Sequence, residues 1–116
     1  VVAPGENRRP VTTVKFDQAE INLGTVKFGD VLEKTICFTN TGKEDLKIEF
    51  VQGGCTCTIP LEYPRKAIAP GKKGCIKFKF DSSVADVKKG YSSSIEIYGN
   101  VKDDVLLYYL TADIIE

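Results

Sequence analysis

The sequence predicts an all-β domain, and three observations lead to that prediction. Apolar residues recur at every second position along several stretches, which is the period of a half-buried strand rather than of a helix. Turn residues separate these stretches at short intervals, and no segment shows a convincing helical period. About seven strands in about 100 residues are typical of an immunoglobulin-like antiparallel β-sandwich, and a closed barrel is the alternative.

The expected strands follow one another along the whole chain. They cover residues 12–16, 20–24, 33–40, 45–50, 75–80, 93–99 and 105–115. The clearest are DLKIEF and CIKFKF, in which large apolar residues occupy every second position. Turn signals such as Pro70-Gly71, which suits a type II turn, lie between them. The inward positions predict a core made of Ile36, Phe38, Leu46, Ile48, Phe50, Ile76, Phe78, Ile95, Ile97 and Leu110.

Length and charge limit the kinds of protein that this chain can be. Its 116 residues suit one domain, and we expect a single sandwich over residues 11–116 after a flexible polar leader, residues 1–10. Sixteen basic and sixteen acidic side chains balance, so the basic surface of a nucleic-acid binder is not expected. No apolar run approaches the ~20 residues of a membrane span. The composition therefore predicts that the chain neither binds nucleic acid nor spans a membrane, and it leaves the oligomeric state open.

Cys37 and Cys75 are out of phase with the core residues beside them, so both are expected on an outer sheet face. In a sandwich of this kind their strands are antiparallel neighbours. The register that places Cys37 opposite Cys75 also places Glu33 opposite Lys79, which is a favourable cross-strand pair. It turns Lys34 inward, so that its ammonium must reach water at a sheet margin. We predict a Cys37–Cys75 disulfide, with two free thiols as the alternative.

The segment GGCTCTIP, residues 53–60, holds the other two cysteines. Cys55 and Cys57 would project to one side of an extended segment, as two thiolates that hold Cu(I) or half of a zinc site would. The chain has no histidine, so the only further thiols are those of Cys37 and Cys75. We favour a structural role, with no metal or cofactor, where the chain crosses between sheets. The alternative is a thiol protein that uses Cys55 and Cys57 to bind a soft metal or to exchange disulfides.

Catalytic motifs are missing from the sequence, and we assign no catalytic or cofactor-binding residue. Without histidine there is no Ser-His or Cys-His pair. The segment Pro70-Gly71-Lys72 lacks the other residues of a phosphate-binding loop. Asp103 and Asp104 are better explained as a solvated turn than as an acid–base pair. The chain is therefore predicted not to be an enzyme.

Leu107 and Tyr109 are the candidate residues for a partner surface. If Tyr108 faces the core in the last expected strand, Leu107 and Tyr109 point together toward solvent. Clustered apolar side chains on a surface mark protein-binding faces. We expect an unknown protein partner there.

The order of these motifs resembles one known family. NLGTVKFGD, FTNTG, GGCTCTIP, APGKKG and SSIEIYGN resemble a bacterial Ig-like domain-of-unknown-function family, number 1573, over residues 16–114. Thr56 stands where that family more often has glycine, and Cys37 and Cys75 are additional to its pattern. The resemblance extends distantly to sandwiches of the major-sperm-protein and pilus-chaperone type, which bind other proteins. It implies a β-sandwich and a cell-envelope setting.

The predicted function is that of a non-enzymatic Ig-like envelope module, for protein contact or for spacing. Four cysteines in a small domain favour an oxidising compartment. We expect a periplasmic, cell-surface or secreted protein whose export signal, of ordinary or lipid-anchoring type, was removed upstream of residue 1.

Overall fold

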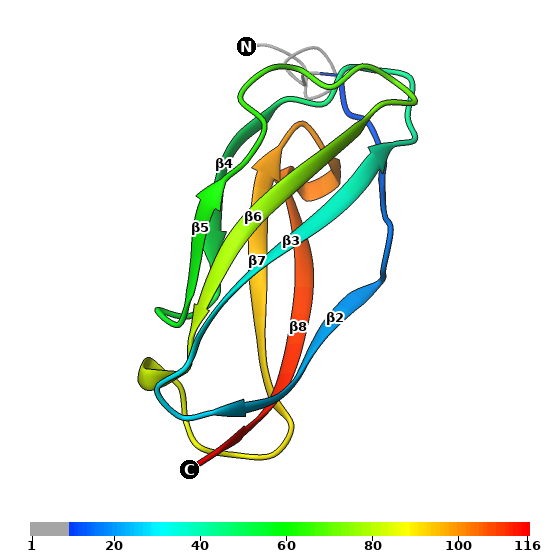
Figure 1. Ribbon diagram of the computed structural model, residues 1–116. Coiled ribbons are helices and arrows are strands. Elements are labelled where there is room, and N and C mark those ends of the chain that lie inside the picture. The colour runs from blue at the N-terminus through cyan, green and yellow to red at the C-terminus, as the bar shows by residue number, and fades with distance from the viewer. Residues whose placement is uncertain (1–9) are drawn as a thin grey trace.

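The computed structural model describes residues 10–116, which form two four-stranded β-sheets packed face to face (Figure 1). One sheet has the strand order β1-β3-β6-β5, and the other has the order β2-β8-β7-β4. The bounds are β1 Val14–Phe16, β2 Glu20–Lys27, β3 Val31–Asn40, β4 Ile48–Gly53, β5 Thr58–Glu62, β6 Lys73–Asp81, β7 Tyr91–Gly99 and β8 Val105–Ile115, with 3-10 turns η1 Ser82–Val84 and η2 Lys102–Asp104. The predicted sandwich is confirmed. The predicted leader, except for Pro10, lies outside the described residues.

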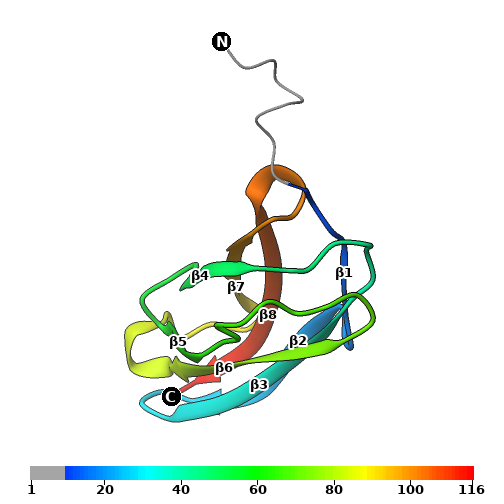
Figure 2. The same cartoon turned by 90° about the horizontal axis from the view of Figure 1, so that it is seen from above.

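The first part of the described chain contributes to both sheets. β1 pairs antiparallel with β3, and the chain then crosses so that β2 pairs with β8. The β2–β8 pair is parallel, whereas the other strand pairs of the described chain are antiparallel. Figure 2 shows the two layers from above, with β5, β6 and β3 in one and β4, β7 and β8 in the other. Among residues 10–116 no helix is long and apolar enough to cross a membrane.

β5 is a strand that hydrophobic alternation did not predict. It contains Pro60, which has no N–H to give to a ladder. β5 pairs with β6 alone and lies at the edge of its sheet, where a proline is tolerated because one side of the strand has no ladder partner.

The core lies between the sheets and contains every predicted core residue except Phe50. The register of β4 against β7 shifts between Ile48 and Phe50, which reverses the side that each following residue faces. Val51 is therefore buried, and Phe50 is 45% exposed. The β3–β6 register agrees with the prediction, and Lys34 lies opposite Phe78 but remains exposed.

Asn40 holds the loops at one end of the sandwich. Its side chain is fully buried, and its amide donates to the carbonyl oxygens of Glu44 and Ile68, both at 2.8 Å. Its own carbonyl oxygen accepts from Thr12 Oγ1 at 2.6 Å and from the N–H of Gly42 at 3.1 Å. The Asn-Thr-Gly motif of the sequence is thus a structural clamp.

Asn100 acts in the same way on the neighbouring segment. Its amide donates to the carbonyl oxygens of Pro10 and Asp45, and its carbonyl oxygen accepts from the N–H of Lys47. A surface hollow of about 470 Å³ lies beside these contacts. Since Asn100 gives its polar atoms to the backbone, its role there is to shape the loops.

Candidate functional site

The segment that carries Cys55 and Cys57 joins β4 in one sheet to β5 in the other (Figure 1). The prediction that GGCTCTIP is a crossover is therefore confirmed. The N–H of Gly54 donates to the carbonyl oxygen of Ser94 in β7 at 2.7 Å. The N–H of Asp81 in β6 donates to the carbonyl oxygen of Cys57, also at 2.7 Å. The segment is thus hydrogen-bonded to both sheets.

Two glycines allow this close approach. A Cβ atom on Gly53 would collide with the carbonyl group of Thr58, and a Cβ atom on Gly54 would collide with Ser94. Neither glycine has a positive φ. They are required because the crossover lies directly against other backbone, and not for a special turn conformation.

Cys55 and Cys57 are joined to each other by a disulfide. The sequence alone left their oxidation state open. Cys57 has no exposed surface, whereas Cys55 is partly exposed. In this state neither sulfur is a thiolate that could bind a soft metal. Within residues 10–116 there is also no cluster of three or more His, Cys, Asp or Glu side chains that could hold a metal.

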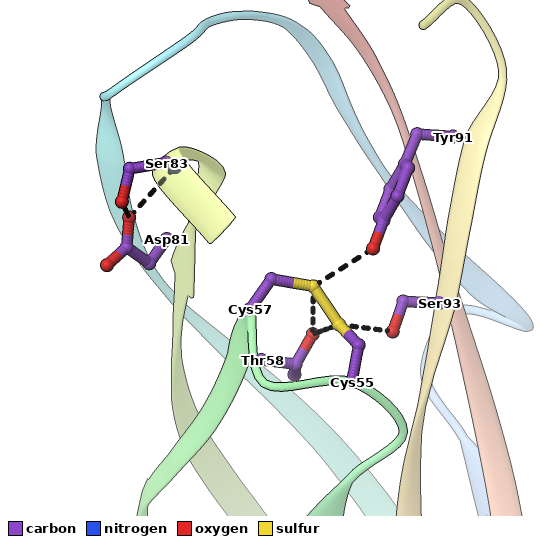
Figure 3. The surroundings of a disulfide bond; sticks show 7 residues. All are labelled: Cys55, Cys57, Thr58, Asp81, Ser83, Tyr91 and Ser93. Carbon is purple, nitrogen blue, oxygen red and sulfur yellow. Dashed lines mark hydrogen bonds between the residues drawn. A yellow bond between two sulfur atoms is a disulfide. The ribbon is translucent and has the colours of Figure 1, made fainter. Parts of the chain in front are cut away.

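Three hydroxyl groups surround the two sulfur atoms (Figure 3). Ser93 Oγ lies 3.1 Å from Cys55 Sγ, and Tyr91 Oη lies 3.2 Å from Cys57 Sγ. Thr58 Oγ1 lies between them, 3.5 Å from Cys55 Sγ and 3.9 Å from Cys57 Sγ. Because disulfide sulfurs carry no hydrogen, each hydroxyl group is the donor.

Tyr91 and Ser93 were not predicted as site residues. Tyr91, Ser93 and the buried Ile95 occupy every second position of β7 and so share its inner face. This spacing is the sequence signal that could have identified Tyr91 and Ser93. Burial raises the pKa of Tyr91, and the charge of Asp86 raises it further. The phenol therefore stays protonated and keeps its donor at neutral pH.

Cys37 and Cys75 form the second disulfide, which joins β3 to β6 at the predicted register. Its two cysteines are 38 residues apart in the chain. No hydroxyl group of the described residues donates to either sulfur. This disulfide closes a long loop on an outer sheet face, which suits a structural role.

The outer face of the second sheet carries a group of large side chains. Leu107 and Tyr109, the predicted partner surface, are 48% and 51% exposed. Tyr98 on β7 and Phe50 on β4 extend this group, and their rings stack with centroids 4.3 Å apart. We call Phe50, Tyr98, Leu107 and Tyr109 the outer aromatic patch. Phe50 was missed because the β4 register shift is not visible in the alternation.

Acidic side chains accompany the outer aromatic patch. Glu96 lies opposite Leu107 in register, and its Oε1 atom accepts from Tyr98 Oη at 2.7 Å. That hydrogen bond raises the pKa of Tyr98, and burial and the Glu96 charge add to the effect. Glu20 lies opposite Tyr109 on the neighbouring strand. The face is therefore both apolar and acidic.

The fold is similar to several solved structures. A protein of unknown function from Porphyromonas gingivalis is 17% identical with a TM-score of 0.72, and the match covers 89% of this chain and 47% of that one. The secreted serine protease VesC from Vibrio cholerae is 18% identical with a TM-score of 0.64, over 90% of this chain and 23% of that one. A PapD-like domain of human CEP192 is 14% identical with a TM-score of 0.64, over 100% of this chain and 94% of that one.

These likenesses show the fold. The chain spans less than half the length of the first two structures. No curated protein matches the chain. Residues 14–114 match the family described as protein of unknown function, DUF1573. The match covers nearly all of the two sheets, and this chain belongs to the DUF1573 family.

Proposed function

We propose that this chain is a non-enzymatic β-sandwich module of the bacterial cell envelope that binds another protein through the outer aromatic patch. The observation that supports the proposal is the exposure of Phe50, Leu107 and Tyr109 on one sheet face, at 45%, 48% and 51%. The outward positions of a solvated antiparallel sheet are normally polar. Large side chains that gather there, tyrosine above all, are typical of the centre of a protein interface.

The acidic neighbours define the chemistry of the partner. Glu96 and Glu20 lie among the patch residues, and burying either without a counter-charge would be unfavourable. A partner that places an apolar side chain over Leu107 and a lysine or arginine near Glu96 would satisfy both requirements. The partner surface is therefore proposed to be apolar with a basic rim.

The envelope setting is part of the proposal. Two disulfides suit an oxidising compartment, and they are seldom kept in the cytosol. The chain covers under half of the Porphyromonas protein and of VesC. We therefore propose that residues 11–116 form one domain, after a leader, in a longer protein. The absence of histidine from the sequence supports protein binding rather than hydrolysis as the function of this chain.

Site-specific photocrosslinking tests this function. The full-length protein, produced in its own bacterium, would carry benzoylphenylalanine in place of Tyr109. A matched variant would carry it in place of Thr35, which is exposed on the outer face of the other sheet. We expect a defined adduct from position 109 that is absent from position 35. The adduct should weaken when Glu96→Lys reverses the charge, and not when Glu33→Lys does so on the other face. Equal crosslinking from both faces would refute the proposal.

A further inference from the structure

The Cys55–Cys57 disulfide has a property that goes beyond protein contact and involves none of the patch residues. We propose that it is a thiol–disulfide exchange site, which accepts the thiolate of a dithiol protein at Cys55 Sγ and releases Cys57 Sγ as the leaving thiolate. The proposal stands on three features of the structure: the shortness of the loop that the disulfide closes, the unequal exposure of its sulfurs, and the hydroxyl donors around them.

The loop is too short for the disulfide to be an effective staple. Cys55 and Cys57 are 2 residues apart, whereas Cys37 and Cys75 are 38 apart. Because the entropy lost by the unfolded chain grows with the length of the closed loop, the short loop stabilises the fold much less than the long one. Backbone hydrogen bonds from Gly54 and Asp81 already hold the crossover to both sheets. Stability alone therefore gives little reason for this second disulfide.

The two sulfurs differ in their access to solvent. Cys55 is partly exposed and Cys57 has no exposed surface. An attacking thiolate approaches one sulfur along the S–S axis and expels the other. Because Cys57 is covered and Cys55 is partly exposed, we expect an outside thiolate to attack at Cys55 Sγ. Attack there leaves the charge on Cys57 Sγ.

The surroundings of Cys57 suit a leaving group. Burial without hydrogen bonds would disfavour a thiolate. Tyr91 Oη lies 3.2 Å from Cys57 Sγ and Thr58 Oγ1 lies 3.9 Å from it, and each hydroxyl group can donate to that sulfur. A hydrogen bond to the charged form favours that form, and a leaving thiol of lower pKa departs faster. Tyr91 is thus a positioning residue for the departing sulfur.

The exchange balances in two steps. In the first, the partner's thiolate forms a bond to Cys55 Sγ, and the electron pair of the Cys55–Cys57 bond stays on Cys57 Sγ. In the second, the partner's other thiolate attacks the partner sulfur of this mixed disulfide and releases Cys55 Sγ. Two electrons and two protons pass from the partner dithiol to Cys55 and Cys57, and the partner gains a disulfide. Each chain reacts once until a disulfide oxidant restores it.

Glutathione is the probe that tests where attack occurs. The oxidised protein would react with glutathione under native conditions, be quenched with N-ethylmaleimide and be mapped by fragmentation mass spectrometry. We expect glutathione on Cys55 and maleimide on Cys57. The oxidised peptide GGCTCTIP is the matched control, and it should be attacked at both sulfurs because it lacks the fold. Glutathione on Cys57 of the protein, equal attack on both sulfurs, or no adduct where the peptide reacts would overturn the proposal.

Tyr91→Phe tests the leaving-group assignment. Loss of one hydrogen bond of about 0.5–1.5 kcal/mol corresponds to a rate about two- to tenfold lower. Tyr63→Phe is the control that removes a phenol hydroxyl group elsewhere, and it should leave the rate of adduct formation unchanged. An unchanged rate in Tyr91→Phe would overturn the role of Tyr91. Since these residues lie outside the outer aromatic patch, neither result depends on the crosslinking outcome.

A dithiol probe tests the complete transfer. A reduced peptide with two cysteines should emerge oxidised, at one equivalent per chain, when it is mixed with the oxidised protein. The double variant Cys55→Ser with Cys57→Ser retains the Cys37–Cys75 disulfide and should yield no oxidised peptide. Equal oxidation by this variant would show that the other disulfide reacts, and the proposal would fail.

Discussion

Phe50 and Tyr98 lie face to face on the outside of the sandwich, with ring centroids 4.3 Å apart and 14° between the ring planes. Phe78, in β6 of the other sheet, faces the core between the sheets and has no exposed surface. The chain therefore offers the same residue type in two environments, one of them stacked in solvent and the other enclosed in the core.

This contrast predicts a difference in stability between two alanine variants. Phe78→Ala should lower the free energy of unfolding by about 3–5 kcal/mol, because it removes a buried ring and leaves a cavity. Phe50→Ala should lower it by about 1 kcal/mol or less, since its side chain is 45% exposed and its ring stacks on Tyr98 at the surface. Urea denaturation of both variants checks this. Equal losses would contradict the positions of the two rings.

The two disulfides should differ in what they contribute to stability. Cys37→Ala with Cys75→Ala should lower the free energy of unfolding by about 4 kcal/mol, and Cys55→Ala with Cys57→Ala by about 1.6 kcal/mol. The reason is the length of chain that each bond restrains in the unfolded state. Denaturation without reductant measures both, and a larger loss from the short loop would contradict this account.

Asn40→Ala should destabilise the protein by about 3 kcal/mol. The change takes a donor from the carbonyl oxygen of Glu44 and leaves that of Ile68 with the N–H of Leu46 alone. It also removes the acceptor of the Thr12 hydroxyl group and of the Gly42 N–H, and an unsatisfied buried polar group costs about 1–3 kcal/mol. Asn22→Ala is the control: Asn22 is exposed and accepts one hydrogen bond, from Gly24. Thermal or urea unfolding should show at most about 1 kcal/mol for the control. Similar losses at both positions would argue against the clamp.

Glu96→Gln should lower the pKa of Tyr98 toward its ordinary value. The raised pKa means that the folded state holds the phenol proton more tightly than the unfolded state. The associated stability is fully present below the ordinary tyrosine pKa of about 10 and is lost as pH rises through the raised folded value. Titration of the ring signals by NMR measures the change. Tyr91 is the internal control, because burial and Asp86 cause its shift. A parallel drop at Tyr91 would point to a general disturbance.

The oxidised protein should carry no stoichiometric copper or zinc. Both sulfurs of Cys55 and Cys57 are committed to a disulfide, and a disulfide is a poor ligand compared with two thiolates. Elemental analysis of protein purified without chelators checks this. A soft metal at one per chain, lost in Cys55→Ser with Cys57→Ser, would instead support a metal-binding role.

Most of the fold could be predicted because one side of each strand faces the core and requires apolar residues, whereas the other side faces solvent and tolerates polar ones. That alternation located the strands from β1 to β8 except β5, whose proline and edge position remove the pattern. It failed within β4 because the register shift after Ile48 exchanges the inner and outer faces. A shift of this kind depends on the partner strand, and the sequence of β4 alone does not contain it.

The two disulfides were unequally predictable for a related reason. Cys37 and Cys75 lie on neighbouring strands whose phase and charge pairs set the register, so their contact follows from local patterns. The surroundings of Cys57 come from Tyr91, which is 34 residues away along the chain. Only the packing of the crossover against β7 brings these groups together, and no local sequence pattern predicts that packing.

The parallel pairing of β2 with β8 has a mechanical consequence. The described chain begins at one end of the sandwich and finishes at the other, and both strands run toward the same end (Figure 1). A pull that separated the two ends would drag β2 and β8 past each other along their length. The hydrogen bonds between them, from Glu20–Tyr109 to Lys27–Ile115, would then bear the load together and not break one at a time. Such a geometry resists stretching of the domain along its long axis.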